Sequence, residues 1–301
     1  MKQYFLRPTL KLLERKCSVT SNGLIQIINQ HNYSNATIEE NEAVKFKRFA
    51  NYWWDPSGDL KPLHTMNRLR VPFIQNGLSP STIEPITGSV FLPLKDKKIL
   101  DVGCGGGILT EPLSMLGAQV LGIDQVEESI NSAKEHVEAT SYRWVTHSNL
   151  QKPVYRLASL QTIAQESPCH FDAVVASEVL EHVTDWEGML KSITDCLKLG
   201  GMLFVTTINH TTTSLLLGIV AAEYIVGIVP RGTHEWNKFI EPSRLQFACI
   251  KHGLQPRQVI GMQYNPLTCR WSWRSNLSVN YALSAMKVAG QKLLISITCA
   301  A

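Results

Sequence analysis

The segment "KKILDVGCGGG", which begins at Lys97, limits the possible folds more than any other part of the sequence. An apolar strand runs directly into a turn with glycines at 103, 105, 106 and 107. Glycine lets the backbone pass close to a ligand where a side chain would collide. A second apolar strand, "AQVLGID" (118–124), follows the helix-like stretch "ILTEPLSML". This order predicts a parallel sheet with a ligand bound at the glycine-rich turn.

The centre of the chain continues the alternation. A helical pattern over 127–139 precedes a short strand near "VYRLAS", the apolar strand "FDAVVAS" (171–177), a helix over 186–198 and the strand "MLFVTT". Strands that alternate with helices predict a doubly wound, mostly parallel α/β sheet of the Rossmann-like kind. Ahead of it, residues 40–54 and 64–77 predict two short helices joined by a turn at 55–58. We therefore expect an N-terminal helical cap over 39–95 and a main domain over 96–286.

An acidic residue completes the glycine-rich site. Asp124 lies 21 residues after Gly103, at the end of the second strand, where a carboxylate can accept both hydroxyls of a ribose. Position 108 is Ile, so the third glycine of the dinucleotide fingerprint is absent, which disfavours an NAD-binding oxidoreductase. Gly103, Gly105 and Asp124 thus indicate a nucleoside cofactor held without a pyrophosphate turn, which points to S-adenosylmethionine. Asp101 is expected to hold the loop rather than to perform chemistry.

A second group of ionisable residues follows the strand "FDAVVAS". Ser177 ends that strand, at the edge where open α/β sheets bind ligands. On a helical turn Glu178, Glu181 and His182 would share one face, at positions i, i+3 and i+4. Two carboxylates and an imidazole predict a divalent-cation site, although glutamates in a first turn also serve the helix dipole and Mg²⁺ prefers oxygen ligands. His182 could instead act as a general base.

Charge and cysteine content exclude two classes of protein. The first 38 residues hold five Lys or Arg and one acidic residue, and the rest of the chain has 24 of each sign, so no nucleic-acid footprint is visible. A nucleic-acid methyltransferase would also favour an N-P-P-Y motif after 171–177, and none is present. The seven cysteines form no C-x-x-C pair, which suits a reducing compartment and argues against a disulfide framework or a zinc site.

Two segments concern location. Residues 1–38 are basic, nearly free of acids and rich in Ser, Thr and Asn, which is typical of a mitochondrial transit peptide; a disordered basic tail is the alternative. The stretch 213–230 has an uninterrupted apolar part of only 215–222, too short to span a membrane. We expect an insertion over 213–235 to cover the active site and to rest on the membrane surface through 213–231, with a buried helix as the alternative.

Several motifs together carry a resemblance to a known family. They are "LDVGCGGG", "GID", "WWDPSGDLKPLHTMNRLR" (53–70), "EVLEHV" (178–183), "AAEYIVGIVPRGTHEW" (221–236), "KFIEP" (238–242), "YNPLT" (264–268) and "VNYAL" (279–283). In this order the chain resembles the ubiquinone-biosynthesis O-methyltransferases, in their mitochondrial branch, within the class I S-adenosylmethionine-dependent methyltransferases. The resemblance covers residues from about 42 to about 285, and the tail 287–301 has no counterpart in it.

The resemblance implies a fold, a ligand set and a reaction. It implies a seven-stranded sheet whose last strand is antiparallel, and S-adenosylmethionine bound by Arg70, Gly103, Asp124 and Ser177. It further implies that Glu178, Glu181 and His182 bind Mg²⁺ or another divalent cation, which would acidify and orient the attacking hydroxyl.

The implied substrates are catechol-type hydroxyls of polyprenyl-dihydroxybenzoate and demethylubiquinol intermediates. The implied place is the matrix side of the mitochondrial inner membrane, as a peripheral protein beside other enzymes of the quinone-synthesis complex. Two alternatives stay open, namely a non-catalytic scaffold that binds S-adenosylmethionine and a methyltransferase of another small catechol. An insertion-like loop lies between 145 and 155, just ahead of the expected adenine contacts near Ala158, Ser159 and Leu160.

Overall fold

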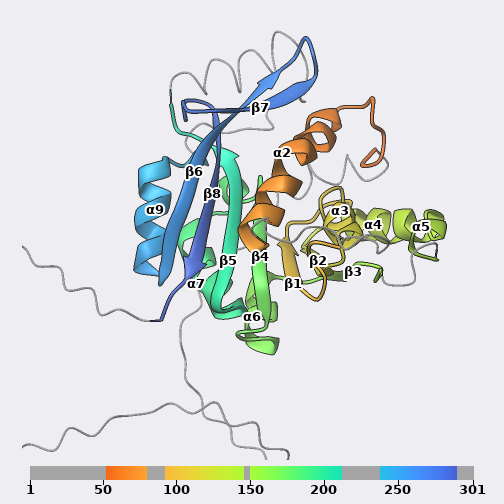
Figure 1. Cartoon of the computed structure of the whole chain (residues 1–301), viewed down its shortest axis with the longest axis horizontal. Coiled ribbons are helices and arrows are strands. Elements are labelled where there is room, and N and C mark those ends of the chain that lie inside the picture. The colour runs from red at the N-terminus through yellow and green to blue at the C-terminus, as the bar shows by residue number, and fades with distance from the viewer. Residues whose placement is uncertain (1–51, 80–91, 146–149, 212–237, 290–301) are drawn as a thin grey trace, which may run out of the picture. The chain divides into compact units, whose positions relative to one another are not determined.

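The computed structural model describes residues 52–79, 92–145, 150–211 and 238–289. The predicted transit peptide (1–38), the insertion over 213–235 and residues 290–301 of the tail lie outside these described residues. One sheet of eight strands organises the described part, in the order β3-β2-β1-β4-β5-β8-β6-β7 (Figure 1). The strands are β1 (Lys98–Val102), β2 (Gln119–Asp124), β3 (Val154–Leu157), β4 (Phe171–Ser177), β5 (Leu197–Ile208), β6 (Leu254–Asn265), β7 (Arg270–Arg274) and β8 (Asn280–Lys287).

The parallel half of the sheet matches the sequence prediction. β1 pairs in parallel with β2 and β4, β2 with β3, and β4 with β5. β8 then enters antiparallel between β5 and β6. The expected count of seven strands is too low by one, because residues 266–269 form a turn that folds β7 back onto β6 as an additional edge strand.

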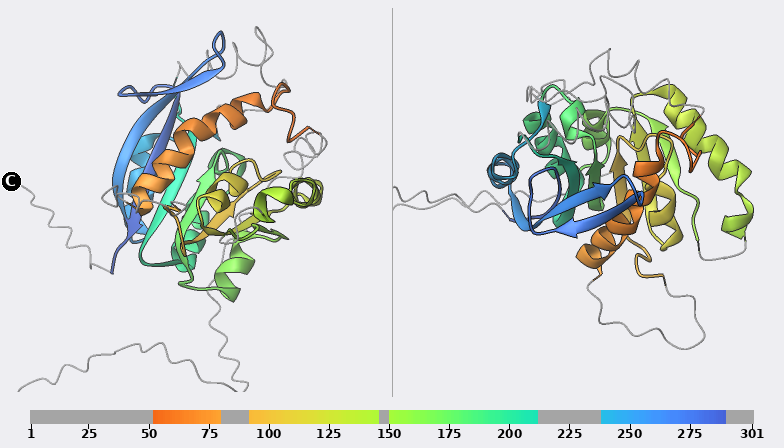
Figure 2. Two further views of the ribbon diagram at one scale, coloured as in Figure 1. Left: turned by 45° about the vertical axis from the view of Figure 1, so that its right-hand side comes forward. Right: turned by 90° about the horizontal axis from the view of Figure 1, so that it is seen from above.

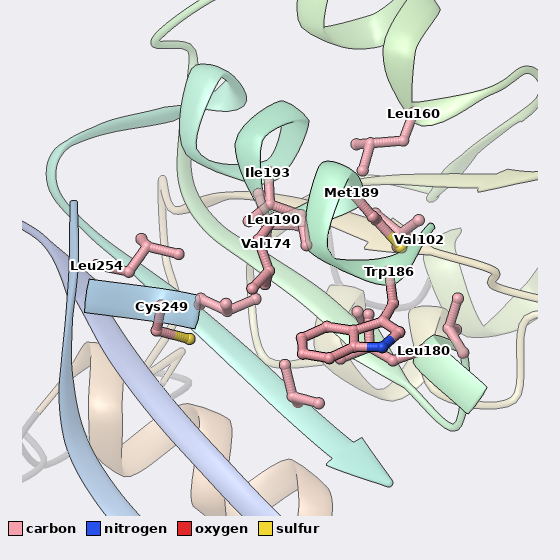
Figure 3. Packing of buried hydrophobic residues seen from close by; sticks show 14 of the residues in the cluster. Val102, Leu160, Val174, Leu180, Trp186, Met189, Leu190, Ile193, Cys249 and Leu254 are labelled. Atoms are coloured by element: carbon pink, nitrogen blue, oxygen red, sulfur yellow. The ribbon is translucent and has the colours of Figure 1, made fainter. Parts of the chain in front are cut away.

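Helices cover both faces of the sheet (Figure 2). Side chains of a strand alternate between the two faces of the sheet, so successive residues of β1 contact helices on opposite faces. Leu100 packs in a core cluster with α6 (Leu160–Glu166), α7 (Trp186–Cys196) and α9 (Pro242–Lys251). Ile99 packs on the other face with α2 (Lys61–Leu78) and residues of α3 (Thr110–Met115). Figure 3 shows the first cluster, in which Trp186 and Met189 of α7 lie beside Val102 at the end of β1.

The predicted helices are found with small differences. α4 (Glu127–Ala139) has the predicted bounds, and α7 ends two residues early because Leu197 already belongs to β5. In the cap, α2 begins three residues before the prediction. The predicted helix over 40–54 lies outside the described residues except for 52–54, which form a turn. Short helices α5 (Tyr142–Val145) and η1 (Leu180–His182) complete the described elements. No helix within the described ranges is both long enough and apolar enough to cross a membrane.

Candidate active site

A pocket lies at the carboxyl ends of β1 and β2, the edge at which the sequence predicts the cofactor. Its lining is mostly apolar and consists of Val102, Gly103, Ile123, Asp124, Gln125, Ala158, Leu160, Gln161, Val179, Val183 and Met189. Gly103 has a φ of +65°, and a Cβ there would lie 2.6 Å from Val179 Cγ2. The pocket wall therefore requires glycine at this position. Two of the three expected adenine contacts line the pocket, while Ser159 instead caps α6.

Asp124 is held in place by the backbone around it. The N–H of Gly105 donates to Oδ2 and the N–H of Val126 donates to Oδ1, each at 2.9 Å. Burial raises the pKa of Asp124, and these two backbone hydrogen bonds lower it. Each carboxylate oxygen has two lone pairs, so each can accept one further hydrogen bond. The carboxylate is thus oriented and still able to accept two ribose hydroxyls.

Asp101 has the structural role that the sequence suggests, and the neighbouring Cys104 is also structural. Thr110 Oγ1 donates to Asp101 Oδ2 at 2.6 Å, which ties β1 to the start of α3 across the glycine-rich loop. Burial raises the pKa of Asp101 to about 6, opposed by the Thr110 hydrogen bond and the positive charge of Arg70. Cys104 is buried in a small core cluster with Tyr155 and Ala133, and burial raises the pKa of its thiol well above the ordinary value.

The cap holds the glycine-rich loop through two tryptophans, Trp53 and Trp54, whose role no local sequence pattern predicted. A Cβ on Gly106 would lie 2.3 Å from Cγ of Trp53, so this glycine makes room for the indole ring rather than for a ligand. Trp54 Nε1–H donates to the carbonyl oxygen of Gly106 at 2.9 Å. The Trp54 ring also stacks on His136 of α4, with centroids 3.4 Å apart and planes 4° apart. The adjacent pair "WW" just before α2 is the signal from which such a clamp could have been suspected.

Arg70 brings the cap to the end of β4. Its Nη1 donates to Ser177 Oγ at 2.9 Å, a contact between residues 107 positions apart. Its Nη2 donates to Leu63 O and to Asn67 Oδ1, and Nε also donates to Asn67 Oδ1. Burial lowers the pKa of Arg70 to about 10, while Glu178 and Asp101 raise it.

These contacts limit how Arg70 can meet a ligand. A guanidinium has five N–H donors, and four of those of Arg70 already bond to the protein. One N–H on Nη1 remains, so a bidentate contact through Nη1 and Nη2 would require Arg70 to release one of its two Nη2 partners, Leu63 O or Asn67 Oδ1.

The turn after β4 differs from the predicted helical turn. Glu178 has a φ of +57°, and its N–H donates to Thr206 O at 2.8 Å, continuing the pairing with β5. Only Leu180–His182 then forms a single 3₁₀ turn. The prediction that Glu178, Glu181 and His182 share one face of a helix is therefore wrong, because Glu178 is left-handed and lies outside the 3₁₀ turn.

The three side chains of this turn have different surroundings. Glu181 is 3% exposed and accepts a hydrogen bond from Thr207 Oγ1 at 2.8 Å, on β5. His182 is 9% exposed. Glu178 Oε1 is buried, and no hydrogen-bond donor among the described residues reaches it.

Within the described ranges, no group of three or more His, Cys, Asp or Glu is arranged to hold a metal ion. The predicted magnesium ligands are therefore not assembled in this conformation.

Comparison with known proteins identifies the family. Residues 85–259 match the family model described as a methyltransferase domain. The chain is 46% identical over 259 residues to the mitochondrial ubiquinone biosynthesis O-methyltransferase of Bos taurus, covering 86% of this chain and 68% of that protein. It is 39% identical over 250 residues to the ubiquinone biosynthesis O-methyltransferase of Bordetella bronchiseptica, covering 83% of this chain and 95% of that protein. The chain belongs to the ubiquinone biosynthesis O-methyltransferase family. It is thus a methyltransferase.

Solved structures agree on the fold. The magnesium protoporphyrin IX methyltransferase of Synechocystis, with bound S-adenosylhomocysteine, superposes with a TM-score of 0.55 at 17% identity, over 82% of this chain and 95% of that one. The same enzyme with bound S-adenosylmethionine gives a TM-score of 0.52 at 15% identity, over 84% of this chain and 100% of that one. At such identities the likeness shows the class I methyltransferase fold alone. The cofactor follows from membership of the family, and it is S-adenosylmethionine.

The pocket suits this cofactor. Asp124 offers two oriented acceptors at one side, and the apolar lining by Leu160, Val179 and Met189 suits a planar base. The glycine-rich loop has no further turn for a pyrophosphate, which S-adenosylmethionine lacks.

Proposed function

We propose that this chain transfers the methyl group of S-adenosylmethionine to a catechol-type hydroxyl of polyprenylated ring intermediates in ubiquinone biosynthesis. The observation that carries the proposal is the 46% identity to the bovine mitochondrial enzyme over 86% of this chain, joined by 39% identity to a bacterial enzyme of the same name. The substrates proposed are polyprenyl-dihydroxybenzoate and demethylubiquinol. The composition of residues 1–38 and the mitochondrial relatives support a mitochondrial site, for which we propose peripheral binding at the matrix face of the inner membrane.

Each residue of the site has a proposed role in binding. Asp124 accepts the ribose hydroxyls, and Gly103 leaves room for the cofactor at the pocket wall. Arg70 supplies positive charge and one N–H toward the carboxylate of the methionine part, and Ser177 holds its guanidinium in place. Bound S-adenosylmethionine supplies a sulfonium-activated methyl group and leaves as S-adenosylhomocysteine.

His182 is the proposed general base. A phenolic hydroxyl is a weak nucleophile until it loses its proton, and imidazole is the side chain that most often accepts such a proton. His182 lies in the turn directly after β4, on the edge of the sheet that carries the pocket. We propose that it takes the hydroxyl proton as the new oxygen–carbon bond forms.

A divalent cation stays a prediction, drawn from the resemblance. Mg²⁺ would lower the pKa of the substrate hydroxyl and align both ring oxygens. Glu178, Glu181 and His182 would have to rearrange to bind it, since no ligand group is formed by the described residues.

The test is methyl transfer from labelled S-adenosylmethionine to a short-chain dihydroxy-polyprenylbenzoate, on protein lacking residues 1–38, with and without EDTA. We expect labelled product in the absence of EDTA. Turnover that persists in EDTA would support a base-only step, whereas turnover lost in EDTA and restored by Mg²⁺ would show that the reaction requires a cation. Cofactor binding with no turnover in any condition would favour a scaffold inside the quinone-synthesis complex, and turnover only on unprenylated catechols would favour a different substrate.

A further inference from the structure

The β6–β7 hairpin reaches the edge of the sheet that carries the cofactor pocket. Ile208 of β5 pairs with Asn280 of β8, which pairs with Met262 of β6, so these three residues lie in one row. β5 and β6 run in the same direction, because β8 is antiparallel to both. β6 continues three residues past this row to Asn265 before it turns, which corresponds to about 10 Å at the rise of a strand. The hairpin tip thus projects on the side where substrate must enter.

The tip ends in an exposed apolar side chain. Leu267, in the turn between the two strands, is 94% exposed, the highest value for any large hydrophobic residue of the described part. Tyr264 and Trp271 stand just behind it, half-buried, with ring centroids 5.2 Å apart. Tyrosine and tryptophan are enriched at the interfaces of membranes with water.

The part of the chain that forms the hairpin carries charge of one sign. From Pro242 to Ala301 the sequence has no Asp or Glu and seven Lys or Arg. Two of these, Arg270 and Arg274, belong to β7 and are exposed. They point away from α2, since the alternating residues Trp271 and Trp273 face that helix.

The hairpin is also held rigidly. Trp271 Nε1 donates to Pro62 O at 2.9 Å, and the Trp273 ring lies 5.7 Å from that of Phe73, both partners being on α2. α2 is the helix that carries Arg70 to Ser177. These contacts therefore fix the position of the hairpin tip relative to the end of β4, and any surface that binds the tip lies at a defined distance from the pocket.

We propose that the β6–β7 hairpin is a membrane-contact site, in which Leu267 enters an anionic lipid surface and Arg270 and Arg274 lie at its phosphates. This rests on the proposed function, because a polyprenylated substrate resides in a bilayer and must reach the pocket from it. The hairpin is a different part of the sequence from residues 213–231, which the sequence also predicts to rest on the membrane. The contact would present the pocket edge of the sheet to the lipid.

The experiment is co-sedimentation of the full chain with vesicles of equal parts phosphatidylcholine and phosphatidylglycerol, and with phosphatidylcholine alone. We expect Leu267→Ser to weaken partition about tenfold on anionic vesicles, from the loss of one buried leucine. Arg270→Gln is expected to weaken it about fivefold on anionic vesicles and to leave neutral vesicles unchanged. Residues 213–231 are the same in every variant, so differences between variants report the hairpin.

The matched control is Leu199→Ser. Leu199 is 66% exposed but lies near the start of β5, at the opposite edge of the sheet. Partition of Leu267→Ser within about twofold of wild type, or an equal loss in Leu199→Ser, would overturn the proposal. So would a change in oligomeric state by light scattering without a change in partition, because the tip would then contact a second copy.

Methyl transfer to a water-soluble short-chain substrate, measured on the same variants, separates this proposal from the proposed function. We expect it to be unchanged in all three. Intact vesicle binding with no methyl transfer in wild type would defeat the proposed function and leave the hairpin contact standing.

Discussion

At the scale of single residues, the site depends on charges held out of water by specific partners. Arg70 is 4% exposed and bonds to three residues of the protein, including Ser177. Asp124 is oriented by two backbone N–H groups. Small substitutions at these positions should weaken cofactor binding or stability, because a buried charge or donor that loses its partner raises the free energy of the folded state.

Arg70→Lys tests the cationic contact. A lysine keeps the charge but cannot reproduce a planar fork of donors. We expect the Kd for S-adenosylmethionine, measured by calorimetry, to rise about tenfold to a hundredfold. Arg68→Lys, at an exposed position on the same helix, is the control. An unchanged Kd in Arg70→Lys would show that Arg70 only supports the fold.

His182→Gln tests the general base. Removing a base typically costs about a hundredfold or more in kcat. We expect that loss with little change in the Kd for S-adenosylmethionine. The control is His170→Gln, because His170 is exposed and precedes β4, whereas His182 follows it. Equal losses in both variants, or none in His182→Gln, would contradict the assignment.

Asp101→Asn tests the buried carboxylate through its pH dependence. The pKa of Asp101 is raised to about 6 in the folded protein. The folded state therefore binds a proton that the unfolded state releases, and stability falls as pH rises from about 4 to about 6. Relative to Asp101→Asn, we expect the free energy of unfolding of wild type to drop by about 2–3 kcal/mol between pH 4 and pH 7. Urea unfolding of both proteins at each pH measures these free energies. A difference between wild type and Asp101→Asn that does not change with pH would show that the pKa of Asp101 is not raised.

At the scale of elements, the cap controls the shape of the glycine-rich loop. Trp54 bonds to Gly106 O and stacks on His136, whose Nδ1 lies 2.6 Å from Glu111 Oε1. Asn67 Nδ2 donates to Ile108 O at 2.7 Å, further along the same loop. The loop is thus held by the cap on one side and by Asp124 on the other.

Trp54→Phe tests this clamp. Phenylalanine keeps a ring to stack on His136 but removes the N–H that bonds to Gly106, a loss of about 1 kcal/mol. We expect an approximately fivefold rise in the Kd for S-adenosylmethionine and faster amide exchange over 103–109. Tyr52→Phe, at a position 59% exposed, should leave both unchanged. Loop exchange equal to wild type in Trp54→Phe would mean that the cap does not restrain the loop.

At the scale of the whole molecule, one sheet joins the two core clusters, so they should unfold together. Leu100 and Ile99 are neighbours on β1, fully buried on opposite faces. We expect Leu100→Ala and Ile99→Ala each to cost about 2–5 kcal/mol and to shift a single transition seen by far-UV circular dichroism and by tryptophan fluorescence. Leu199→Ala, at an exposed position, should change stability by about 0.5 kcal/mol or less. Two separate transitions would show that the faces unfold independently.

The sequence by itself determined the class of fold and the place of the cofactor. Alternating strands and helices, the glycines after β1 and the acid after β2 are local patterns, set by backbone sterics and by the period of apolar residues. Thus α4 was predicted with its observed bounds, and Gly103 and Asp124 line the pocket as expected.

Only the tertiary structure decided which side chains meet. Arg70 and Ser177 are 107 positions apart, and Trp53 fills the space beside Gly106, contacts that no local pattern encodes. The turn after β4 is left-handed at Glu178 because pairing with β5 continues through it, which displaced the predicted helical face. β7 forms because it pairs with the edge strand β6 and because its tryptophans pack against α2. Contacts of this kind depend on elements brought together from afar, and so they follow from packing rather than from sequence spacing.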